Sequence, residues 1–362
     1  MLLGAVPFTV FASDAKTLEE INRENAAAYA VSFVDVVFEN PGLESGDVIP
    51  FYDETDQLSG YCVDIVDDGQ PNGYVIIKFS NGEQTVSEFA IEPGVKNPYD
   101  QMAEEKNVSL EDVTYYSVGP NDYQIVDTDS NVVYGFESEE STISQFQTMK
   151  QQVQFQQILN AEMVNLNGGS ENYSTNALVH DVISDTYTGT VHSRGGLTGA
   201  GSATYCNQYT IQNTLGKTYA CAVVALCNMM KYYYSRGRTN IDANLATMYD
   251  AIWNYAGTDS GGGTLASKIP GAAQQYLNSK GYSCSYNSFS TYSNFIYWIG
   301  ENRPCIFAYT IGGSGHAVFV LGYVKTVNYN YLQVMDGWNS YSRYLNFSGY
   351  NYTAKYGYSF QA

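Results

Sequence analysis

Residues 220–234 read ACAVVALCNMMKYYY, an apolar run without Gly or Pro. A run that is apolar on nearly every side predicts a buried helix. The turn-like GKTY precedes it, so Cys221 falls in the first turn of the predicted helix. The positive end of the helix dipole stabilises a thiolate there, and the thiolate is the nucleophilic form of cysteine. Cys227, in the middle of the same helix, is expected to be inert.

The sequence after this helix predicts more helices and then strands. Helical patterns end in Gly or polar residues, whereas the later runs are short, apolar and rich in β-branched residues. Helices followed by strands indicate the α+β class. No repeat, P-loop or dinucleotide motif interrupts this region. The predicted helices are 241–257, 266–281 and 290–302, and the predicted strands are 303–310, 316–324, 331–337 and 343–347.

The region before residue 166 predicts a second unit, also α+β but rich in strands. It opens with a helical pattern at 18–38, continues with six or more short strands separated by Gly, Asn and Asp turns, and closes with a helical pattern at 143–164. Residues 1–165 carry 29 acidic and 6 basic residues, a net charge of −23, while residues 166–362 carry 8 and 11, a net charge of +3. Opposite charges favour association of the two units, and the acidic total argues against a nucleic-acid partner.

A connector is predicted between the two units at 166–204, because Gly, Ser, Thr and Asn are frequent there and no periodicity is sustained. Exposed segments of this composition are where proteolytic cuts concentrate, so a processing site is expected in it. The predicted organisation is therefore a unit at 18–165, a linker at 166–204 and a unit at 205–362.

The first residues favour export. Residues 2–12, LLGAVPFTVFA, have the length of a signal-peptide apolar core and are too short to span a bilayer. Residues 1–13 are thus interpreted as a signal peptide or its remnant, and a secreted or cell-surface location without a membrane segment after export is expected. The six cysteines show no CxxC pair and no zinc spacing, so no metal or cofactor is expected.

A base for a cysteine nucleophile must come from three histidines. His180 and His192 lie in the predicted connector, whereas His316 stands at the start of an apolar strand after GGSG. Asp336, on the next predicted strand, is the candidate for orienting the imidazole, because a hairpin would bring the two residues together. Each residue alone also has an ordinary structural interpretation: a lone His is often structural, and DG often marks a turn.

Three motifs together resemble the streptopain-like members of the papain-like cysteine peptidases. They are CAVVALCNMMKYY (221–233), GHAVFVLGY (315–323) and VMDGW (334–338), in the order and spacing of that family. The tyrosine-rich strands of the first unit are similar to the propeptides of these enzymes. The resemblance implies a papain-like domain with a helical half and an antiparallel β half, preceded by an inhibitory prodomain.

The resemblance also implies roles for individual residues. Cys221 would be the nucleophile, His316 the base and then the acid, Asp336 the orienting group, and Trp338 the shield over the His–Asp contact. The family's oxyanion Gln usually stands six residues before the Cys, where this chain has Leu215. Gln212 is therefore assigned to the oxyanion, with Asn213 as the alternative. For the residue that orients the histidine, the papain-like register selects Asp336, whereas aligning the Gly-Trp pairs would place Met335 there. Asn339 is the runner-up to Asp336.

These inferences predict a secreted cysteine endopeptidase zymogen that hydrolyses protein or peptide substrates and is activated by removal of its first unit. Two alternatives stay open. One is a related Cys-His hydrolase, either a cell-wall amidase or a bacteriocin-processing peptidase. The other is a non-catalytic surface binding protein that keeps the fold, because function resides in the site rather than in the scaffold.

Overall fold

The structure is a computed structural model that describes residues 17–80, 83–111, 113–119, 122–127, 133–135, 183–200, 215–217, 219–259, 263–311 and 314–362. The predicted signal segment, the predicted helix at 143–164, and both oxyanion candidates, Gln212 and Asn213, lie outside these residues. The described elements combine helices with a large, mainly antiparallel sheet, so the predicted α+β class is confirmed.

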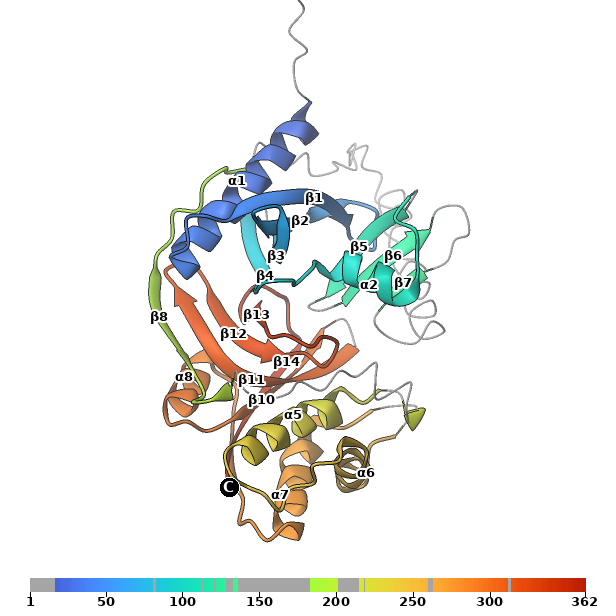
Figure 1. The fold of residues 1–362 in the computed structure, drawn as a ribbon, viewed down its shortest axis with the longest axis vertical. Helices are drawn as coiled ribbons and strands as arrows, with labels where there is room; N and C mark the ends of the chain where they lie inside the picture. The colour runs from blue at the N-terminus through green and yellow to red at the C-terminus, as the bar shows by residue number, and fades with distance from the viewer. Residues whose placement is uncertain are drawn as a thin grey trace, which may run out of the picture.

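Helices occur at both ends of the described chain (Figure 1). Two belong to the N-terminal region and the others follow residue 220. The bounds are α1 Leu18–Phe38, α2 Pro98–Lys106, α5 Cys221–Ser235, α6 Leu245–Ala256, the short 3-10 helix η2 Ala266–Lys268, α7 Ile269–Ser279 and α8 Tyr292–Gly300.

One sheet runs through both halves of the molecule, in the order β7-β6-β5-β1-β2-β3-β4-β13-β12-β11-β10-β14-β9, with β8 added on β11. The halves join where β4 pairs antiparallel with β13. The strands are β1 Glu44–Tyr52, β2 Leu58–Asp67, β3 Gln70–Ser80, β4 Glu83–Ile91, β5 Val113–Gly119, β6 Asp122–Asp127, β7 Val133–Gly135, β8 Val191–Gly196, β9 Ser285–Phe289, β10 Cys305–Ile311, β11 Ser314–Thr326, β12 Asn330–Met335, β13 Arg343–Asn346 and β14 Ala354–Gln361.

Helix α1 covers one face of the N-terminal strands and has the bounds that the sequence predicts. Thr17 caps it in a capping box with Glu20, which satisfies two amides of the helix start. Its buried side packs Phe33 edge-on against Phe89 of β4 and Tyr331 of β12. The core under α1 therefore includes a strand of each half.

The opposite face of these strands forms a separate core beneath α2. Tyr74 of β3 and Tyr99 of α2 are fully buried there. Trp338 and Tyr341, which follow β12 in the chain, belong to the same core. The N-terminal region thus packs directly on the segment after β12.

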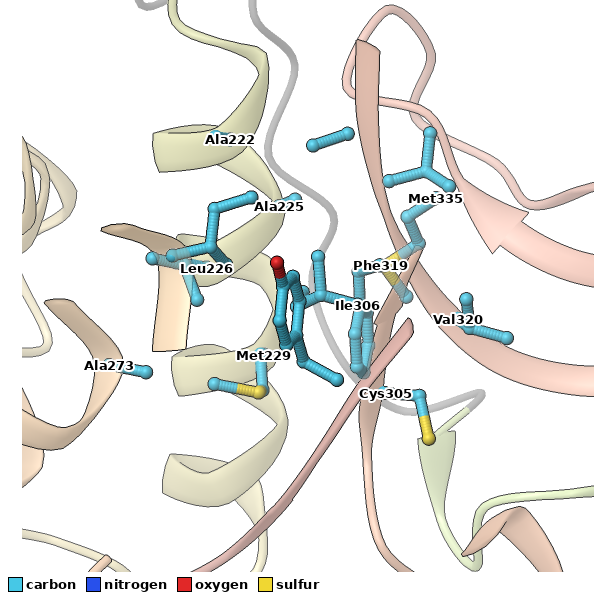
Figure 2. Packing of buried hydrophobic residues seen from close by; sticks show 14 of the residues in the cluster. Ala222, Ala225, Leu226, Met229, Ala273, Cys305, Ile306, Phe319, Val320 and Met335 are labelled. Atoms are coloured by element: carbon cyan, nitrogen blue, oxygen red, sulfur yellow. The ribbon is translucent and has the colours of Figure 1, made fainter. Parts of the chain in front are cut away.

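The largest core lies between the C-terminal helices and β10 to β13. Figure 2 shows Ala225 and Met229 of α5 on the side that faces Phe319 of β11 and Met335 of β12. All four side chains are at most 2% exposed, so α5 is the buried helix that its sequence predicts. This packing fixes the start of α5 against the ends of the central strands.

The predicted connector has a defined structure over residues 183–200. Ile183 N–H donates to Asn22 Oδ1 of α1 at 3.0 Å, and Tyr187 N–H donates to Ser32 Oγ of the same helix at 2.7 Å. Further on, β8 pairs with residues 322–326 of β11. In Figure 1 this segment runs along one side of the molecule from α1 to α8. Residues 183–200 thus contact both halves, and we call this segment the strap. The remaining residues of the predicted connector lie outside the described part of the chain.

Asp64 on β2 is expected to make the stability of the N-terminal region depend on pH. Burial raises its pKa to about 6, although Asn97 Nδ2 donates to it at 2.8 Å. The folded state therefore retains a proton that the unfolded state loses near pH 4, and the stability contributed by the protonated group is lost as the pH rises from about 4 to 6. Asp64→Asn keeps the acceptor for Asn97 and is expected to raise Tm at pH 7 by roughly 2–4 °C, and by less at pH 4.5. Thermal denaturation of both proteins at the two pH values tests this, and an equal difference at both would contradict it.

Candidate active site

Cys221 is the first residue of α5, the position that its sequence predicts. Ala220 precedes it at the N-cap position. Because alanine has no side-chain acceptor, no side chain of the N-cap residue accepts a hydrogen bond from the first-turn amides of α5. Cys221 is partly exposed, whereas Cys227 on the same helix is fully buried. The helix therefore presents one thiol at its positive end and encloses the other.

Three other cysteines are held as neutral thiols. Burial raises the pKa of Cys284 to about 11. It also raises the pKa of Cys62 and of Cys305, both of which are fully buried. Because the thiolate is the reactive form, these three side chains are poor nucleophiles.

His316 lies near the start of β11, where it pairs with Tyr309 of β10. Its Nε2 donates to the backbone oxygen of Asp336 at 3.0 Å. Its ring stacks on Trp338 with centroids 5.8 Å apart and an interplanar angle of 5°. The Tyr309 ring contacts it edge-on at 5.8 Å. Strand, loop and two aromatic rings therefore fix the position of the imidazole.

The hydrogen bond to Asp336 also fixes the tautomer of His316. A carbonyl oxygen can only accept, so Nε2 carries the proton and Nδ1 keeps its lone pair. Burial lowers the pKa of His316 to about 4, an effect that the positive charge of Arg343 reinforces and the carbonyl acceptor opposes. At neutral pH the imidazole is therefore uncharged in this state, with Nδ1 as its basic atom.

The carboxylate of Asp336 points elsewhere. Its Oδ1 accepts from the backbone amides of Trp338 and Asn339 at 2.9 and 3.2 Å. Its Oδ2 accepts from Asn339 Nδ2 at 2.9 Å and lies 2.7 Å from Nη2 of Arg343. Gly337, with a φ of 88°, provides the left-handed turn between Asp336 and Trp338. Asp336 thus orients His316 through its main-chain oxygen, while its side chain shapes the loop.

The structure brings three of the five predicted site residues together. His316, Asp336 and Trp338 form the cluster described above. Cys221 begins α5. The residue after it, Ala222, belongs to the same hydrophobic core as Met335, which precedes Asp336. Asn339 is 1% exposed, and its Oδ1 has no hydrogen-bond partner among the described residues. Gln212 is outside the described part of the chain.

Sequence reasoning missed Arg343 and Glu88, whose side chains are fully buried and paired with each other. The sequence did contain a signal for this pair, namely a charged residue at a strand position where alternation predicts an apolar one. A buried charge requires a partner, so such a residue indicates a buried ion pair. In SEFAI, Glu88 interrupts such a run.

The described residues contain no group of three or more His, Cys, Asp or Glu side chains placed to hold a metal ion. None of the helices in the described ranges is both long enough and apolar enough to cross a bilayer.

Comparison with known proteins extends these observations. No curated protein gives a significant match. Among solved structures, the chain is similar to a fragment of Prevotella intermedia prointerpain A carrying a Cys-to-Ala substitution, at 10% identity and a TM-score of 0.39, covering 86% of this chain and 97% of that one. Residues 202–359 match the model of the Peptidase_C39 like family. Over that region, the chain is therefore similar to cysteine peptidases, as the resemblance to papain-like enzymes predicted.

Proposed function

We propose that the chain is the precursor of a secreted cysteine endopeptidase with Cys221 as nucleophile and His316 as base. The observation that supports this most is the placement of His316, an imidazole that donates from Nε2 to the main-chain oxygen of Asp336 and stacks on Trp338. In this tautomer Nδ1 keeps the lone pair with which a base accepts a proton.

The proposed reaction is acyl transfer to the sulfur of Cys221. Nδ1 of His316 takes the proton of Cys221, and the sulfur attacks a peptide carbonyl. The oxyanion is held by the Cys221 backbone amide and by the side-chain amide of Gln212 or Asn213. The imidazolium then gives its proton to the departing amine, and water hydrolyses the thioester with His316 again acting as base.

In this proposal the N-terminal region, 18–165, is an inhibitory prodomain. Trp338, which stacks on His316, packs in the core of that region with Tyr74 and Tyr99. This burial helps keep His316 uncharged, whereas a thiolate needs an imidazolium beside it. Removal of the prodomain after a cut in 166–204 would hydrate the imidazole and raise its pKa, which favours the ion pair.

Two alternative functions are distinguished by substrate and by chemistry. A cell-wall amidase or bacteriocin-processing peptidase would use the same Cys and His on another amide. A surface binding protein would have no need of a reactive Cys221.

A thiol-directed covalent inhibitor tests the proposal. The full chain is incubated with casein, with and without the inhibitor, and the modified cysteine is identified by peptide mapping. Casein cleavage is expected to begin after a lag in which the chain shortens, and to stop in proportion to labelling of Cys221. Cys227, on the same helix but fully buried, is the matched internal control. Cleavage by fully labelled protein, or labelling of Cys227 alone, would disprove the assignment.

A further inference from the structure

Arg343 stands at the junction of the two halves. It is the first residue of β13, which pairs on one side with β12 and on the other with β4. Strand β12 leads into Asp336, and β4 carries Glu88. Arg343 Nη1 donates to Glu88 Oε1, while Nη2 lies 2.7 Å from Asp336 Oδ2. The order of the strands thus places one guanidinium between a carboxylate of each half.

This trio is enclosed. Glu88 and Arg343 are 0% exposed and Asp336 is 1% exposed. Charges so far from water persist only when they are paired and hydrogen-bonded, so each member depends on the others.

Glu88 is itself held from two sides. Its Oε1 accepts from the hydroxyl of Tyr74, and its Oε2 accepts from the hydroxyl of Tyr123, both at 2.7 Å. The carboxylate that receives Arg343 Nη1 therefore has a fixed place in the N-terminal region. A guanidinium with one nitrogen so anchored presents its other nitrogen in a defined direction, because the group is planar and rigid.

That direction leads to the loop that orients the base. Arg343 holds Asp336 Oδ2, the other oxygen of the same carboxylate closes the turn at Trp338 and Asn339, and the main-chain oxygen of Asp336 accepts from His316. We propose that Arg343, anchored by Glu88, is a positioning residue that acts through Asp336 to hold His316 in its Nε2–H tautomer.

The inference rests on the proposed role of His316 as a base, yet its test needs no peptidase activity. The full chain is produced with ¹⁵N-labelled histidine, on a Cys221→Ala background that prevents self-cleavage. Only three histidines contribute signals, and the His316→Gln spectrum assigns the one of interest. In the otherwise unchanged chain, His316 is expected to show a protonated Nε2 and an unprotonated Nδ1 at pH 7.

Arg343→Lys keeps the positive charge but cannot reach both carboxylates in one plane. It is expected to convert the single tautomer of His316 into a mixture, with at least a several-fold faster exchange of the Nε2 proton. Glu88→Gln retains an acceptor for Arg343 and is expected to give a smaller change in the same direction.

A control separates positioning from general loss of stability. Val37→Ala removes buried volume from the core under α1, a different core from that of Tyr74 and Tyr123, and gives a destabilised chain with Glu88, Asp336 and Arg343 intact. Its His316 signal is expected to match that of the parent. An unchanged tautomer in a folded Arg343→Lys chain, or an equal change in Val37→Ala, would overturn the inference and leave the peptidase proposal standing. Casein cleavage that persists in Cys221→Ala, or no casein cleavage by the wild-type chain, would overturn the peptidase proposal instead.

Discussion

Cys221→Ala is expected to remain at full length under conditions in which the wild-type chain shortens. Without the sulfur no acyl-enzyme can form, and the predicted rate loss is total for self-cleavage and for casein cleavage. Mass spectrometry of the incubated precursors gives the fragment masses directly. The wild-type cut is expected within 166–182 or 201–204 of the predicted connector, because residues 183–200 are bound to α1 and β11.

Two controls accompany this measurement. Cys227→Ala changes the other thiol of the same helix and is expected to shorten like the wild type. Adding a trace of the wild-type enzyme to Cys221→Ala shows whether one molecule can cut another. Shortening of purified Cys221→Ala by itself would mean that a different protease makes the cut.

Arg343→Met is expected to lower the free energy of unfolding by about 3–5 kcal/mol, a large share of what a domain possesses. The methionine fits an apolar setting, but it leaves the carboxylates of Glu88 and Asp336 buried without their cation. Urea denaturation on the Cys221→Ala background measures the change. Glu88→Gln alone keeps the Arg343–Asp336 pair and is expected to cost less, about 1.5–3 kcal/mol.

The double variant provides the decisive comparison. Glu88→Gln/Arg343→Met removes one of the two stranded charges and is expected to be more stable than Arg343→Met, so that the second substitution partly repairs the first. Losses that simply add would mean that Glu88 and Arg343 do not interact energetically.

Local patterns in the sequence predict much of this fold. The capping box and periodicity of 18–38 define α1, and the apolar run after GKTY defines α5, because short-range chemistry decides both. Strand β9 was missed because four of its five residues are exposed at the edge of the sheet, and β14 because Gly357 and Ser359 interrupt its buried run. The pairing of β4 with β13 depends on contacts about 250 residues apart in the chain, which no local pattern encodes.

The candidate site shows the same division. His316 and Trp338 lie together as the motifs predict, because both follow from a short hairpin between β11 and β12. The use of the Asp336 main-chain oxygen, and the turning of its carboxylate toward Arg343, depend on Glu88 in another part of the chain. The spacing of residue types in a sequence does not show whether a residue such as Asp336 will bind its neighbour through the main chain or through the side chain.

The position of the cut relative to the strap at 183–200 determines which product keeps this segment. A cut before Ile183 would leave the C-terminal product with a segment still hydrogen-bonded to Asn22 and Ser32, a contact between the two products in addition to the pairing of β4 with β13. A break after Ala200 would instead carry β8 away with the N-terminal piece and uncover residues 322–326 of β11. Scission of the backbone and separation of the two halves would thus be distinct events, each with its own rate.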